Sequence, residues 1–84
     1  MRFKFENKAL KDFKYWKENH QIIYKKILRL LKSISHNHFE GIGKPEPLKE
    51  NLSGWWSRRI NREHRLIYKI EGDNILILSC RYHY

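Results

Sequence analysis

A small group of ionisable and hydrogen-bonding side chains has the types needed to cleave RNA without a metal ion. The group consists of Glu46, Lys49, Arg59, Arg65, His83 and Tyr84. In metal-free cleavage the ribose 2′-hydroxyl attacks the adjacent phosphorus, which requires a base for the hydroxyl proton, cations for the phosphate and an acid for the departing 5′-oxygen. The group contains a candidate for each task, so these residue types indicate phosphodiester chemistry.

Glu46 is the candidate base, because a carboxylate is ionised at neutral pH. It stands between Pro45 and Pro47. A proline fixes its own φ and restricts the residue before it, so this clamp is expected to hold Glu46 in extended backbone. The alternative interpretation is a stiff loop with no catalytic role.

Arg65, together with Arg59 or Lys49, is the candidate for the phosphate, because guanidinium and ammonium groups bind it as forked or point cations. His83 is the candidate acid, since histidine is the side chain that gains and loses a proton near neutrality. Tyr84 either orients His83 or stacks on a base. We therefore expect Arg65 and His83 to be catalytic and the other three residues to bind substrate or phosphate.

Whether Arg59 and Arg65 share a face of a sheet depends on the register of their strands. They do so only if they pair directly or lie an even offset apart, and a slip of one residue sends them to opposite faces. The turn between the strands does not fix the register. We expect both side chains to reach the open face.

Other familiar chemistries find no support in the sequence. It has no glycine-rich phosphate loop opening a helix and no serine in a nucleophile elbow. His36 and His38 stand two residues apart, with no cysteine or carboxylate spaced to complete a zinc site. We therefore expect that the protein uses no metal and no cofactor. We expect His36 and His38 to lie at the surface of a loop.

The elements that must position these side chains are expected in the order strand, helix, helix, strand, strand, strand. Hydrophobic periodicity and turn residues place them at 2–6, 7–17, 21–35, 55–61, 64–70 and 74–80, with Asn7 as the first helix cap. Residues 36–54 are expected to form a long ordered loop, or a loop with one helical turn. The expected fold is a single α+β domain over residues 1–84, with a helical hairpin on one face of a small, twisted, mainly antiparallel sheet.

Alternation along the strand at 64–70 divides its side chains between the two faces of the sheet. Leu66, Tyr68 and Ile70 are assigned to the helices, and Arg65, Ile67 and Lys69 to the open face. The apolar stripe of the second helix, which follows the helical period of 3.6 residues, is assigned to the core. Its basic side chains form either a solvated face or a groove for RNA or a partner.

Charge and composition suggest which partners and which compartment to expect. The 84 residues carry 18 Lys and Arg against 9 Asp and Glu, a net charge of +9, which favours nucleic acid or an acidic protein as a partner, with simple solubility as the alternative. One cysteine allows no intrachain disulfide and favours the cytoplasm. No long apolar run suggests a signal peptide or a membrane span.

Two stretches of the sequence resemble the YoeB (Txe/YoeB) toxins of the RelE superfamily. Gly43 to Ile70 reads GKPEPLKENLSGWWSRRINREHRLIYKI, and the sequence closes with RYHY. The resemblance implies a RelE-like, barnase-like (microbial RNase) fold and a ribosome-dependent endoribonuclease that cuts messenger RNA in the A site, inhibiting translation.

The resemblance also implies roles for single residues: Glu46 matches the family's base, His83 matches its acid, and Arg65 matches its phosphate-stabilising arginine. Lys49, Arg59 and Tyr84 match its supporting positions. The resemblance also implies an acidic antitoxin whose disordered tail folds on the toxin, and operator DNA bound mainly through the antitoxin. Whether the chain forms a homodimer is left open.

Two alternatives belong to other functional classes. A ParE-like toxin shares the fold but inhibits gyrase by protein binding. A non-catalytic nucleic-acid-binding module explains the charge alone. Neither needs both Glu46 and His83, so these two residues discriminate between the candidates.

Overall fold

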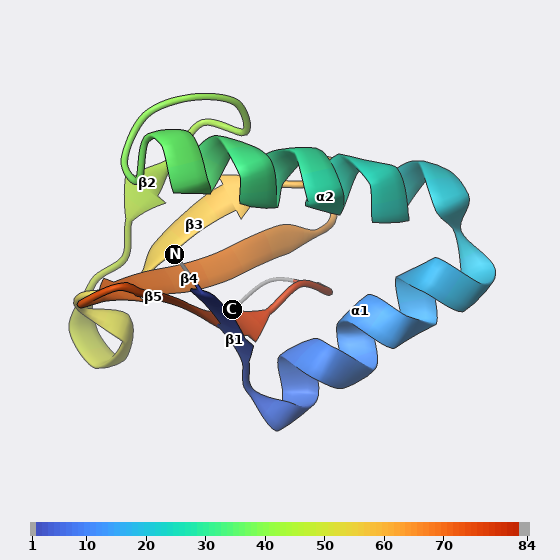
Figure 1. The fold of residues 1–84 in the computed structure, drawn as a ribbon, viewed down its shortest axis with the longest axis horizontal. Coiled ribbons are helices and arrows are strands. Elements are labelled where there is room, and N and C mark those ends of the chain that lie inside the picture. Colours follow the sequence, from blue (N-terminus) through green and yellow to red (C-terminus); the bar gives the residue numbers. More distant parts are fainter. Residues whose placement is uncertain (1, 83–84) are drawn as a thin grey trace.

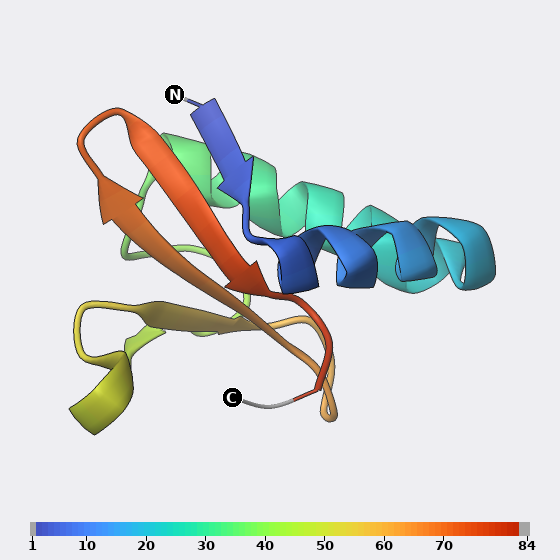
Figure 2. The same ribbon diagram turned by 90° about the horizontal axis from the view of Figure 1, so that it is seen from below.

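Two helices cover one face of a five-stranded sheet in the computed structural model, which describes residues 2–82 (Figure 1). The elements in chain order are β1 (Arg2–Phe5), α1 (Asn7–Asn19), α2 (Gln21–His36), β2 (Glu46–Pro47), the 3-10 turn η1 (Glu50–Leu52), β3 (Trp56–Arg59), β4 (Arg65–Glu71) and β5 (Asn74–Ser79). The helices meet at His20 and form an open V in Figure 1, and Figure 2 shows both on the same side of β4 and β5. The expected α+β architecture is confirmed.

The sheet has the strand order β1-β5-β4-β3-β2. Only β1 and β5 are parallel, so the sheet is mainly antiparallel, as expected. The helical turn expected within residues 36–54 is η1, but the strand β2 in the same segment was not predicted. Two residues are too few to show a period, and proline, which lacks the N–H donor, is tolerated at the edge of a sheet, where β2 lies.

The start of α1 corrects one expectation. Glu6 occupies the cap position and Asn7 is already helical, with no side-chain hydrogen bond from the cap. The reason is that the Glu6 N–H donates to the carbonyl of Ile77 at 2.9 Å, which keeps Glu6 in the extended conformation of β1. The chain then turns directly into the helix.

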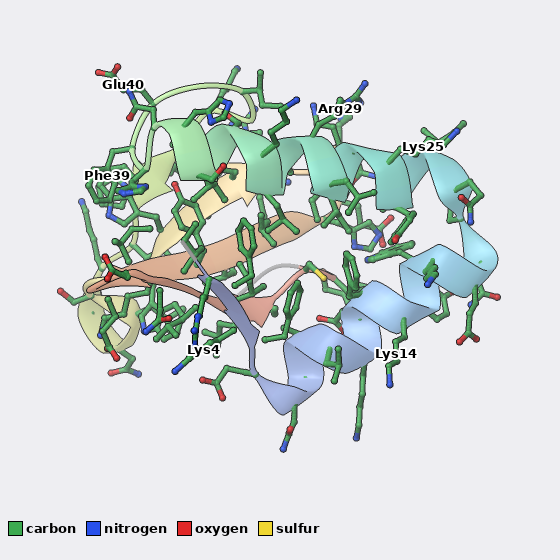
Figure 3. The ribbon with its side chains drawn as sticks, in the orientation of Figure 1. Lys4, Lys14, Lys25, Arg29, Phe39 and Glu40 are labelled. Carbon is green, nitrogen blue, oxygen red and sulfur yellow. The ribbon has the colours of Figure 1, made fainter. Side chains whose placement is uncertain are left out.

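The core lies between the helices and the sheet. The α2 stripe is buried, as predicted, at Ile23, Ile27, Leu30, Leu31 and Ile34. Leu66 and Tyr68 are fully buried against it, and Ile70 packs at its margin, which confirms the helix-facing side of β4. On the outer side of α2, Lys25 and Arg29 point away from the sheet (Figure 3), consistent with a solvated face.

The opposite side of β4 is less open than predicted. Ile67 is fully buried, although Arg65 and Lys69 on the same side remain partly exposed. Ile67 pairs with Ser57 on β3 and Ser79 on β5, and both serines are buried too. Because β4 is a central strand, neighbouring side chains flank Ile67 on both sides, and this middle row of the face is closed to water.

Cys80 follows β5 and is part of the core, as predicted. Burial raises the pKa of its thiol to about 12, Asp12 adds to the effect and Lys8 partly offsets it. Since the thiolate is the reactive form, we expect an aromatic disulfide reagent at pH 8 to label the folded protein only as fast as it unfolds. The same chain in guanidinium chloride is the control, and equal labelling rates for folded and denatured protein would contradict this prediction.

Within residues 2–82, no helix has both the length and the apolar character needed to cross a membrane.

Candidate active site

The strand register brings three of the predicted site residues to one face of the sheet. Arg59 pairs directly with Arg65 across β3 and β4, so their side chains share a face. Glu46 pairs with Ser57, which lies two residues before Arg59 on the same strand, and so Glu46 belongs to that face as well. Two residues along β3 and one step between neighbouring strands correspond to about 8 Å between the Glu46 and Arg59 backbones. Two long side chains can reach across this distance.

Lys49 lies close to Glu46 in the segment that leaves the edge strand. It occupies the cap of η1 and is exposed. Residues 46–52 line a hollow of about 470 Å³, which includes both Glu46 and Lys49. The structure therefore brings the predicted base and the predicted lysine to one concave surface at the edge of the sheet.

The Arg65 guanidinium is fixed by one of its two amino groups. Its Nη1 donates to the carbonyl oxygens of Asn61 at 2.7 Å and His64 at 3.1 Å, and more weakly to that of Arg62 at 3.2 Å. Nε and Nη2 have no protein partner within the described part of the chain. The turn before β4 thus holds the Arg65 side chain, while the guanidinium edge formed by Nε and Nη2 can still bind an anion.

His83 and Tyr84, predicted as the acid and its supporting residue, lie outside the described residues. The residue before them is held at the start of β4. The Tyr82 N–H donates to His64 Nδ1 at 2.7 Å, and the Tyr82 carbonyl accepts from the Arg65 backbone N–H at 3.1 Å. Figure 2 shows this end of the described chain next to the turn between β3 and β4.

Backbone strain accompanies the candidate site. Three non-glycine residues of the described chain have positive φ: Lys44 at 49°, Glu50 at 55° and Tyr82 at 65°. Such conformations cost on the order of 1–3 kcal/mol each and concentrate at functional sites. Here each one lies within two residues of Glu46, Lys49 or His83.

Three basic side chains of the candidate site form no ion pair within the described residues. Among residues 2–82, ion pairs join Lys8 to Asp12 and Lys69 to Glu71, and Glu63 lies 3.7 Å from the His64 ring. Lys49, Arg59 and Arg65 take part in none of these pairs, so their field is available to an anionic ligand.

Metal chemistry finds no donor set in the described structure. No group of three or more histidine, cysteine or carboxylate side chains in residues 2–82 is arranged to hold a metal ion. His36 is exposed, as expected, but it is the last residue of α2 and not part of a loop. His38 is half-buried, with Nδ1 at 2.9 Å from the Ile34 carbonyl.

Two residues that matter for the site were not predicted from the sequence. His64 and Tyr82 connect the C-terminal segment to β4, as described above. Their residue types carry no signal for this role, because it depends on where the chain returns after β5. Arg58, next to Arg59, points to the opposite face and is fully buried, so it does not belong to the site.

Comparison with known proteins places the chain in a family. The family model described as "YoeB-like toxin of bacterial type II toxin-antitoxin system" matches residues 5–84. The proteins named Toxin YoeB from Escherichia coli K12 and Streptomyces coelicolor are 51% and 46% identical to the chain over 84 residues, and each alignment covers all of both proteins.

Solved structures agree with this match. YoeB in the YoeB-YefM complex from Staphylococcus aureus is 52% identical, with a TM-score of 0.94 over 100% of this chain and 98% of that one. A YoeB/ParE toxin from Agrobacterium tumefaciens is 35% identical, with a TM-score of 0.97 over all of both chains. The match to the family model over nearly the whole length, together with these relatives, establishes that the chain belongs to the YoeB-like toxins of bacterial type II toxin–antitoxin systems.

Proposed function

We propose that this toxin is an endoribonuclease that cleaves messenger RNA in the ribosomal A site by metal-independent acid–base catalysis. The observation that carries the proposal is the register: Glu46, Arg59 and Arg65 share one face of the sheet. The hydrogen bonds of Tyr82 to His64 and Arg65 support it further, because His83 continues the chain from a point beside β4.

In the proposed reaction Glu46 takes the proton from the ribose 2′-hydroxyl. The 2′-oxygen forms a bond to phosphorus as the bond to the 5′-oxygen breaks, and His83 gives its proton to that leaving oxygen. Arg65, with Arg59 and Lys49, stabilises the negative charge that builds up on the phosphate oxygens. The products are a 2′,3′-cyclic phosphate and a 5′-hydroxyl end, so atoms and charge balance without a metal ion.

The ribosome would supply what the small protein lacks. No deep cavity in the described structure surrounds Glu46, and its hollow is open. A message held single-stranded in the A site arrives already positioned, which removes much of the entropy cost of aligning the attacking hydroxyl with the bond to be broken. Free RNA is then expected to be a poor substrate.

The proposed partners follow from family membership and charge. The Staphylococcus aureus relatives have been solved as a YoeB-YefM complex and as a YoeB dimer. For this chain, with its net charge of +9, we propose an acidic cognate antitoxin that covers the same basic face and through which operator DNA is bound. The proposed compartment is the cytoplasm, where messenger and ribosomes are found.

The chemistry of the cut ends tests the proposal. When the chain is produced in bacteria, growth should stop and new messenger ends should arise inside codons. Those ends should accept phosphate from a polynucleotide kinase without prior phosphatase treatment, because a 5′-hydroxyl is left. Growth arrest with no new ends would favour a ParE-like or purely binding toxin, and ends carrying a 5′-phosphate would rule out attack by the 2′-hydroxyl.

A further inference from the structure

His64 is a buried imidazole that the proposed cleavage steps do not use. Only 6% of its surface is exposed. Its Nδ1 accepts a hydrogen bond of 2.7 Å from the Tyr82 N–H. A ring nitrogen that accepts from an N–H carries no proton, so His64 must be in the tautomer with its hydrogen on Nε2.

Aromatic rings hold this imidazole in place. Trp16 lies edge-on to it, with ring centroids 4.7 Å apart, and the Tyr82 ring lies at 5.3 Å. Trp16 also donates from Nε1 to the Cys80 carbonyl at 2.8 Å. The same tryptophan therefore fixes both the ring of His64 and the segment that His64 binds.

The segment from Cys80 to Tyr82 is attached to the body of the protein at every residue. The Cys80 N–H donates to Asp12 Oδ2 at 3.0 Å. The Arg81 guanidinium lies over the Tyr15 ring at 3.7 Å. His64 and the Arg65 backbone hold the main chain of Tyr82, the last described residue before His83.

Tyr82 requires this attachment because its backbone is strained. Its φ is 65°, a left-handed conformation that a non-glycine residue adopts only when its surroundings impose it. One hydrogen bond to its N–H and one to its carbonyl impose it here. Removing the acceptor on His64 would let the peptide rotate and would redirect the chain at its next residue.

We propose that His64 is a positioning residue, which fixes the Tyr82 peptide through Nδ1 and so sets the point and direction from which the chain continues to the proposed acid His83. The structural half of this inference concerns Tyr82 alone, whereas its catalytic half rests on the proposed function.

Two substitutions separate the acceptor atom from the ring. His64→Phe keeps a planar ring against Trp16 but removes the acceptor. His64→Asn loses the ring but places Oδ1 close to the position of Nδ1. The structural readout is hydrogen exchange of the Tyr82 amide by NMR, which should be about tenfold faster in His64→Phe than in His64→Asn or the unchanged protein.

The catalytic readout is single-turnover cleavage of a message bound in the A site. His64→Phe should lower the maximal rate by about 10- to 100-fold, because the acid is misplaced, and leave the half-saturating ribosome concentration unchanged. His64→Asn should recover most of that rate despite its smaller side chain. A merely structural role would instead make His64→Asn the worse of the two, since it opens a cavity beside Trp16.

The 15N chemical shifts of the His64 ring provide a measurement that needs no substitution. They should report Nε2–H and an unprotonated Nδ1, and a proton on Nδ1 would overturn the proposal even if His64→Phe failed to fold. Equal Tyr82 exchange in all three proteins would overturn it as well. If the unchanged protein cleaves no message, the proposed function fails, but amide exchange and ring shifts still decide the role of His64.

Discussion

Replacing Arg58 by methionine is expected to lower the free energy of unfolding by about 3–5 kcal/mol, because several acceptors lose a charged hydrogen-bond donor at a cost of about 1–3 kcal/mol for each one left unsatisfied. Small domains have a total stability of about 5–15 kcal/mol, so the variant should be close to unfolding at 37 °C. The neighbouring substitution Arg59→Met should change stability by no more than about 0.5 kcal/mol, because Arg59 is exposed.

The large effect follows from how completely Arg58 is used. The side chain is fully buried, and no carboxylate within residues 2–82 pairs with it. Its guanidinium instead donates five hydrogen bonds of 2.7–3.2 Å, to Tyr68 Oη, Ser33 Oγ and the carbonyls of Asn37, Glu40 and Ile42. Asn37 is the C-cap residue of α2, and the helix dipole favours a positive charge at this end of the helix.

Methionine fills much of the same volume but donates nothing, so these acceptors, most of them partly buried, lose their partner. The loop over residues 37–43 would lose the hydrogen bonds of its Asn37, Glu40 and Ile42 carbonyls. The bonds from Tyr68 Oη to the His38 carbonyl and from the Arg59 N–H to the Gly43 carbonyl would remain. That loop passes so close to α2 that a side chain at Gly41, whose φ is 125°, would collide with Ser33 Oγ. The loop therefore has little freedom to find other partners.

Urea unfolding followed by tryptophan fluorescence measures the difference. The midpoint should fall steeply for Arg58→Met at an unchanged slope, and hardly move for Arg59→Met. A loss below about 1 kcal/mol for Arg58→Met would mean that water replaces the guanidinium in solvating the loop carbonyls.

The contrast between these two arginines shows what the sequence can predict. The helices and the strands of the meander follow from apolar periodicity, because the burial of one face imposes that period. Which of two adjacent arginines is buried depends on strand register, and register depends on pairing across the sheet. Arg59 and Arg65 pair directly, a register that the sequence left undetermined.

Other differences have the same origin in contacts distant along the chain. Glu6 caps α1 because Ile77 binds its N–H, and Ile67 is buried because β3 and β5 flank it. For the site, residue types alone indicated Glu46, because its carboxylate stands between two prolines. Nothing in the residue types revealed that His64 binds Tyr82, a contact between residues 18 positions apart.

The second large effect is expected at Glu46. Glu46→Gln keeps the shape and hydrogen-bonding capacity of the side chain but removes its ability to take a proton. If Glu46 is the general base, the single-turnover rate of cleavage in the A site should fall by about 10²- to 10⁴-fold. Rapid quenching of ribosomes programmed with an end-labelled message measures this rate directly.

Glu50→Gln is the matched control, because the chain places a second carboxylate in the same hollow. Both residues are exposed and line it, and each substitution raises the net charge by one, so attraction of RNA changes equally. They differ in that Glu46 pairs with Ser57 and therefore shares the face of Arg59 and Arg65. Glu50→Gln should stay within about twofold of the unchanged rate. Equal losses in both variants would assign the effect to charge in the hollow, whereas full activity of Glu46→Gln would require a different base for the 2′-hydroxyl.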